Sequence, residues 1–129
     1  MAMQTTSAIL YDGPRNLTMQ FTGVCDGGID NDETLVKKVD VAALSPVAAK
    51  VSIKNCEYEV SGGILRMYWD ADDPVLFESL ASVGEREYET IGGMANNGGL
   101  SATGHILFST LGFDAGSSYS VVLNMIKKY

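Results

Sequence analysis

Two acidic loops are the places in this chain where side-chain chemistry is first expected. One is Asp70-Ala71-Asp72-Asp73, and the other covers residues 26–33 and ends in four oxygen-bearing side chains. Carboxylates grouped in a loop suit Ca²⁺, which takes about six to eight oxygen ligands. Neither loop has a glycine and a distal glutamate at the positions that an EF-hand requires. A solvated turn and a calcium site both stay open for each loop. We predict no metal site, and Asp70 has the simpler role of capping the turn after Trp69.

The cysteines and the histidine form no recognisable catalytic or metal-binding pattern. Cys25 and Cys56 lie far apart without Cys-x-x-Cys spacing, and His105 is the only histidine. A structural zinc site needs about four such ligands, and a cysteine nucleophile would need His105 as its base. In a reducing compartment we expect two unbridged thiols.

Paired carboxylates offer one further route to catalysis. Glycoside hydrolysis uses two Asp or Glu side chains at a fixed separation, and every acidic surface offers many pairs. The candidates here are Glu57, Glu59, Asp70 and Glu78. The sequence also lacks the Gly-x-Ser-x-Gly, His-Glu-x-x-His and P-loop patterns. We therefore predict that this protein is not an enzyme and that it needs no cofactor.

The charge and hydropathy of the chain indicate which kinds of partner the protein does not bind. The formal net charge is −7, and the only basic doublets are Lys37-Lys38 and Lys127-Lys128. Phosphate backbones repel such a surface, so we expect no nucleic-acid partner. The apolar runs are far shorter than the roughly 20 residues of a membrane span, and residues 1–15 lack the apolar segment of a signal peptide. We expect no membrane partner and assembly in a cytosol.

Alternation of apolar and polar residues is the main structural signal, and it predicts β-strands. In residues 16–24, Leu17, Met19 and Phe21 alternate with polar neighbours. The same alternation recurs in residues 65–69 and 119–125. Asp12-Gly13-Pro14-Arg15 predicts a tight turn, and Ser61-Gly62-Gly63 predicts a hairpin. The predicted strands cover residues 5–11, 16–24, 34–40, 51–60, 63–69, 75–80, 106–109 and 119–125.

Helical signals are weak by comparison. Residues 41–49 suit one short turn, and residues 74–80 begin with a proline at a possible first helical position, although their alternation favours a strand. About eight short strands at this spacing predict one all-β domain over residues 1–129, a jelly-roll-like β-sandwich with little helix. Residues 1–7 are polar and would form either an extended N-terminal arm or a frayed end.

Several short motifs follow one another in a familiar order. They are Tyr11-Asp12-Gly13-Pro14-Arg15, Val39-Asp40-Val41, Tyr68-Trp69-Asp70-Ala71, Gly84 with Tyr88, Gly92-Gly93 with Asn96-Asn97, Thr103-Gly104-His105-Ile106, Phe108-Ser109-Thr110, and Gly116 with Tyr119. This order resembles small structural proteins of tailed bacteriophages, similar to capsid decoration (cement) proteins. The resemblance covers most of the chain and implies a compact β-sandwich or jelly roll on the capsid exterior, in a homo-oligomer such as a trimer. It assigns no binding residue, because the matching positions are glycines, aromatics and turn residues.

The resulting prediction is a non-enzymatic decoration protein that binds the major capsid protein and stabilises the outer surface of the virion, assembled in the host cytoplasm. One alternative is a tail or head-tail connector protein. Another is a carbohydrate-binding β-sandwich module, which should present aromatics on one outer face, with Tyr58, Tyr68 and Tyr88 as candidates. The candidate partner contacts are Thr5, Thr6, Tyr68, Leu107, Lys127, Lys128 and Tyr129.

Overall fold

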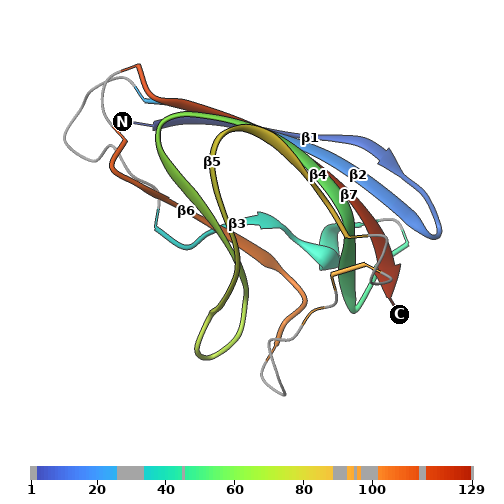
Figure 1. Cartoon of the computed structure of the whole chain (residues 1–129). Coiled ribbons are helices and arrows are strands. Elements are labelled where there is room, and N and C mark those ends of the chain that lie inside the picture. Colours follow the sequence, from blue (N-terminus) through green and yellow to red (C-terminus); the bar gives the residue numbers. More distant parts are fainter. Residues whose placement is uncertain are drawn as a thin grey trace.

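The computed structural model describes residues 3–25, 34–44, 46–88, 93–94, 96, 102–113 and 116–128. Strands make up most of these residues (Figure 1). They are β1 (Met3–Asp12), β2 (Asn16–Cys25), β3 (Val36–Val39), β4 (Lys50–Trp69), β5 (Val75–Glu87), β6 (Ile106–Leu111) and β7 (Ser118–Lys128), with a short 3-10 turn η1 (Val41–Ala43).

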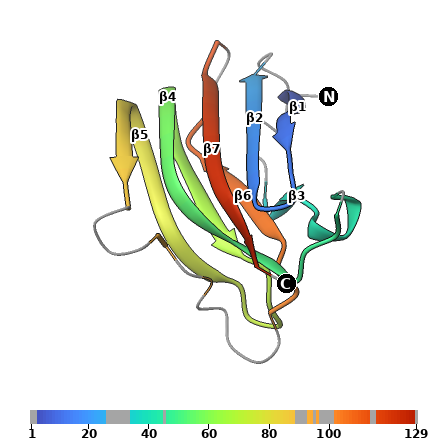
Figure 2. The ribbon, with the colours of Figure 1, turned by 90° about the vertical axis from the view of Figure 1, so that its right-hand side faces the viewer.

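The strands form one antiparallel sheet that folds into two layers. Its order is β1-β2-β7-β4-β6-β3, and β5 pairs with β4 outside this path. Residues 50–61 of β4 pair with β7, whereas residues 64–69 pair with β6. β5 follows β4 through both parts. Figures 1 and 2 show β1, β2, β7 and the first part of β4 in one layer, with β6 and β3 facing it.

A bend in the β4–β5 ribbon joins the two layers. Gly62 has a φ of +88°, and Ser82 on the neighbouring strand has a φ of +65°. Glycine adopts such a conformation without steric cost. A Cβ on Gly63 would lie 2.2 Å from the Phe113 ring, so this site also needs glycine for close packing. The predicted hairpin at Ser61-Gly62-Gly63 is therefore wrong, because these residues bend one continuous strand and the hairpin partner of β4 is β5.

The core lies between the layers and consists of alternate strand residues. Every second residue of β7 is buried, as the alternation predicted. Phe21 of β2 meets Phe108 of β6 across the core, with ring centroids 5.0 Å apart and edge to face. Trp69 is fully buried and stacks on Phe77. The predicted all-β sandwich is confirmed, with both layers drawn from one continuous sheet.

Two segment predictions have clear outcomes. Residues 75–80 are part of β5, so the strand favoured there by alternation is confirmed over the helix. Residues 3–7 are the first half of β1 and pair with β2 over Gly23 and neighbouring positions. The described part of the predicted N-terminal arm is therefore a sheet strand of this chain and does not extend away from it.

Candidate functional site

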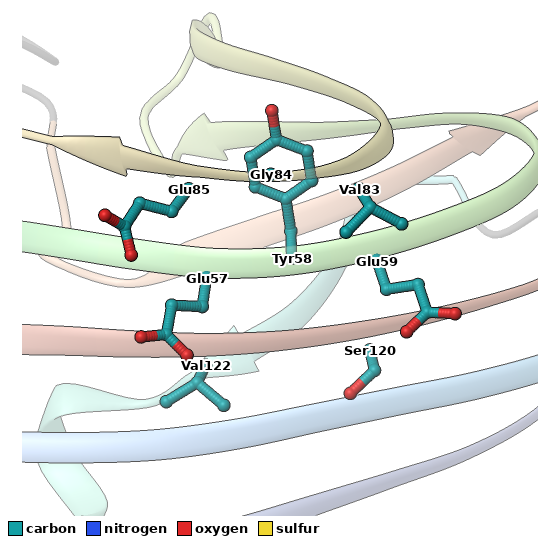
Figure 3. Close-up of a pocket in the computed structure, with 8 residues that line it drawn as sticks. All are labelled: Glu57, Tyr58, Glu59, Val83, Gly84, Glu85, Ser120 and Val122. Atoms are coloured by element: carbon teal, nitrogen blue, oxygen red, sulfur yellow. The ribbon is translucent and has the colours of Figure 1, made fainter.

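An open depression with a volume of about 590 Å³ lies over β4, β5 and β7 (Figure 3). Two cross-strand pairs shape it. Glu57 of β4 lies opposite Glu85 of β5, and Glu59 lies opposite Val83. The lining residues are Glu57, Tyr58, Glu59, Val83, Gly84, Glu85, Ser120 and Val122.

The chemistry of this acidic depression is that of exposed carboxylates. Glu57 and Glu59 point to the same face of β4 because they are two residues apart, and the pairing with β5 adds Glu85. All three are exposed. Like charges directly opposite each other destabilise a strand pair, so the depression favours a cationic group. Of the predicted carboxylate candidates, the structure brings only Glu57 and Glu59 together here.

A second polar cluster lies where the bent β4–β5 ribbon faces itself. The Tyr88 hydroxyl donates a hydrogen bond to the Glu78 carboxylate. The Arg86 Nε lies 4.0 Å from Glu78 Oε1, and the Arg86 guanidinium lies 5.9 Å from the centroid of the Tyr58 ring. Glu78 belongs to the half of β5 that pairs with residues 65–69 of β4, and Arg86 to the half that pairs with residues 55–60. The cluster therefore links the two halves of the ribbon across the bend.

Burial changes the acidity of two groups beside Glu78. Burial, and to a lesser extent the charge of Glu78, raises the pKa of the Cys56 thiol to about 11. Burial, followed by the hydrogen bond to Glu78, raises the pKa of the Tyr88 hydroxyl well above its ordinary value. Both groups are protonated at neutral pH. Because the thiolate is the nucleophilic form, Cys56 is a poor nucleophile in this environment.

We expect Cys56 to resist alkylation in the folded protein. A pKa of about 11 leaves a thiolate fraction on the order of 10⁻³ at pH 8, and the side chain is fully buried. In a Cys25→Ala variant, iodoacetamide should modify the folded protein at least ~100-fold more slowly than the urea-unfolded protein. Mass spectrometry measures both rates, and equal rates would contradict the burial of Cys56.

The raised pKa of the Cys56 thiol makes the free energy of unfolding depend on pH. The folded state holds the Cys56 proton up to about pH 11, whereas the unfolded thiol releases it near pH 9. The unfolding free energy should therefore fall as the pH rises through this window. Urea titrations at pH 8 and pH 10.5 measure the fall, and a Cys25→Ala, Cys56→Ala variant should show a smaller one.

Hydrogen bonds also join three loops at one end of the second layer. Asp70 Oδ2 accepts a hydrogen bond from Thr103 Oγ1 at 2.7 Å, and the Asp70 amide donates to the His105 carbonyl at 3.0 Å. His105 Nδ1 accepts from the Val41 amide at 3.2 Å and lies 3.5 Å from Asp40 Oδ1. We call these five residues the Asp70 junction. The Asp70 side chain therefore binds a segment distant in the sequence, and its predicted role as a local cap of the turn after β4 stays a prediction.

The two acidic loops differ in what the structure describes. In residues 70–73, the Asp70 carboxylate belongs to the junction, while Asp72 and Asp73 are exposed. Within the described ranges, no three His, Cys, Asp or Glu side chains are placed to hold a metal ion. The loop at residues 26–33 lies outside the described residues.

The predicted partner contacts lie at separate places. Thr5 and Thr6 are on β1, where Thr6 Oγ1 hydrogen-bonds Thr22 Oγ1. Tyr68 and Leu107 are cross-strand neighbours on the second layer. Tyr68 is partly exposed, but Leu107 is only 6% exposed. Leu107 is therefore covered by its own chain, which corrects its prediction as an exposed contact.

The C-terminal lysines have opposite environments. Lys127 has no exposed side-chain surface, and its Nζ forms an ion pair with the Asp12 carboxylate and donates to the Pro46 carbonyl at 2.9 Å. The prediction of Lys127 as an exposed contact is wrong, because alternation along β7 places it on the same face as the buried Met125. Lys128 is exposed, and Tyr129 lies outside the described residues.

The three tyrosines named for a sugar platform do not share an outer face. Tyr58 packs against the core and over Gly84, and Tyr88 is buried. Tyr68 lies on the other layer, next to Leu107. The condition set for a carbohydrate-binding module is therefore not met by these residues.

Comparisons with known proteins do not place this chain in a family. No model of a known protein family matches it, and no curated protein matches it significantly. One solved structure that it resembles is a cupin superfamily protein from Desulfitobacterium hafniense, with 12% identity and a TM-score of 0.37, over 98% of this chain and 79% of that one. Among the described residues, none forms a helix of the length and apolarity needed to cross a membrane.

Proposed function

We propose that this protein is a non-enzymatic structural protein of a tailed-phage virion that decorates the outer capsid surface by binding the major capsid protein. The observation that carries the proposal is the Asp70 junction. It joins residues from three of the motifs on which the resemblance to decoration proteins rests: Val39-Asp40-Val41, Tyr68-Trp69-Asp70-Ala71 and Thr103-Gly104-His105-Ile106. The pairing of β3 and β4 with β6 brings these three motifs to one end of the second layer, which agrees with the compact β-sandwich that the resemblance implies.

The acidic depression is a charged surface that suits contact with a capsid subunit. Carboxylates of Glu57, Glu59 and Glu85 line an open depression and suit a basic patch on a capsid subunit. A capsid presents many identical sites, so contacts of modest strength on an oligomer multiply through effective concentration. A decoration protein of this kind needs shape and solubility, which a compact domain with a net charge of −7 supplies.

Binding to capsids tests the proposal directly. Purified protein mixed with undecorated capsids of its own phage should co-sediment with them and raise the temperature at which they break open. A Glu57→Gln, Glu85→Gln variant should bind several-fold more weakly. The charge-matched Asp72→Asn, Asp73→Asn variant should bind as the unmodified protein does, because these exposed residues lie away from the depression.

Two results would overturn the assignment. One is the absence of both co-sedimentation and stabilisation with intact capsids. The other is electron microscopy of labelled virions in which the label is confined to the tail, which would favour the tail or connector alternative.

A further inference from the structure

We propose that β1 is an association edge at which two copies of this chain pair antiparallel and join their sheets. β1 stands at the end of the sheet order and pairs with β2 on one side. On its other side, no strand of the described residues pairs with it. A ten-residue edge of this kind presents a row of amides and carbonyls to which another strand can hydrogen-bond.

The edge of β1 lacks the features that normally block such pairing. Edge strands are usually protected by charged side chains, by proline or by strong bulges. Residues 3–11 contain no charged residue and no proline, and the one irregularity of β1 is the register shift between Ile9 and Tyr11. Asp12 follows this stretch, but its carboxylate is paired with the buried Lys127.

Exposed apolar side chains accompany the open edge. Ile9, Leu10 and Tyr11 are 50%, 56% and 55% exposed, although they belong to a strand of the sheet. Ile9 lies opposite the buried Met19, so it points toward the core side without being covered. A strand added beside β1 would cover part of this surface.

The charge distribution shows where two copies of this chain can approach each other with least repulsion. Two copies with a net charge of −7 repel each other, so they approach best where neither carries charge. Residues 3–11 form such a stretch. Contact through the acidic depression would instead bring Glu57, Glu59 and Glu85 of the two copies together.

The uncharged stretch also sets the register. Its midpoint is Ser7, and a two-fold pair with Ser7 opposite Ser7 keeps the overlap within the uncharged stretch and leaves Asp12 outside it. Thr5 then lies opposite Ile9 of the second copy, and Thr6 lies opposite its Ala8. β-Branched residues such as Thr and Ile are the residues that strands favour. The product is a closed two-fold dimer, not the trimer that the phage resemblance implies. It forms without a capsid, so it stands apart from the proposed function.

A cysteine at Ser7 tests the pairing and its register. Opposed residues of antiparallel strands have Cα atoms about 4.5–5.5 Å apart, a separation that a disulfide can bridge. Ser7 is exposed, whereas Cys25 and Cys56 are buried. Under mild oxidation, most of a Ser7→Cys variant should become a covalent dimer on non-reducing gels. Ser79→Cys, at an exposed position of β5, is the matched control and should stay monomeric on the same gel.

The mass in solution tests the same edge without crosslinking. Sedimentation equilibrium of the unmodified protein should give twice the mass of the 13.8 kDa chain. In a Ser7→Lys variant two lysines would face each other, and dimerisation should weaken at least ~10-fold while the circular dichroism spectrum stays unchanged. If Ser7→Lys does not fold, the comparison of Ser7→Cys with Ser79→Cys decides. A monomeric or trimeric mass, or equal crosslinking of the two cysteine variants, would overturn the proposal.

Discussion

A Gly104→Ala substitution is expected to prevent stable folding. Gly104 has a φ of +91°, which costs an L-residue about 1–2 kcal/mol. A Cβ there would lie 2.0 Å from the Ala49 carbonyl oxygen and 3.1 Å from Val41 Cγ2. Moving Ala49 away would strain the hydrogen bond from its amide to the Lys128 carbonyl. We expect a total loss of at least about 4 kcal/mol, a large part of the stability of an ordinary domain.

Urea denaturation and the yield of folded protein measure this effect. Gly112→Ala is the matched control, because Gly112 has a similar φ of +78° but a Cβ at this position would meet no atom within 4 Å. It should lose only the conformational cost of about 1–2 kcal/mol. Equal losses in the two variants would show that the contact between Gly104 and Ala49 has no effect of its own.

The second large effect is expected from Lys127→Met. The Lys127 ammonium is fully buried with the Asp12 carboxylate, which is itself only 17% exposed. Removing the lysine leaves a largely buried carboxylate and the Pro46 carbonyl without this donor. Loss of one member of a buried ion pair costs about 3–5 kcal/mol. The melting temperature should therefore fall by about 10–20 °C, as measured by calorimetry.

Two further variants separate the effect of breaking the buried ion pair from the effect of removing a lysine from the surface. Lys128→Met changes the exposed neighbour and should alter stability by no more than about 0.5 kcal/mol. An Asp12→Asn, Lys127→Met variant removes the charge left behind and should recover part of the loss. A Lys127→Met variant as stable as Lys128→Met would contradict the buried pair.

The strands could be predicted because their signal is local. In β2 and β7 the alternation of side chains between core and solvent appears directly in the sequence, since each strand has one buried face. The same alternation was decisive for residues 75–80, where a proline also suited a helix. It even contained a signal for Lys127, which continues the buried series Tyr119, Val121, Leu123 and Met125. The general preference of lysine for solvent outweighs that signal in any prediction from sequence.

The candidate sites could be predicted only in part. Glu57 and Glu59 share a face by their spacing, but Glu85 joins them through the pairing of β4 with β5. The contact of Tyr88 and Arg86 with Glu78 depends on the bend in this ribbon. A glycine pair predicts a change of direction without saying whether the chain reverses or bends, so Gly62 and Gly63 did not reveal the bend in advance.

Composition and alternation are enough to predict an all-β domain with an acidic surface and buried alternate residues in most of its strands, because both are properties of short segments. Three features can be seen only in the folded chain: one 20-residue strand belongs to both layers, Lys127 is buried, and Asp70 binds Thr103 and His105. The fold also determines which acidic residues lie together and that β1 is an open edge of the sheet. These features depend on the register between distant strands, and register is set by the packing of the whole core.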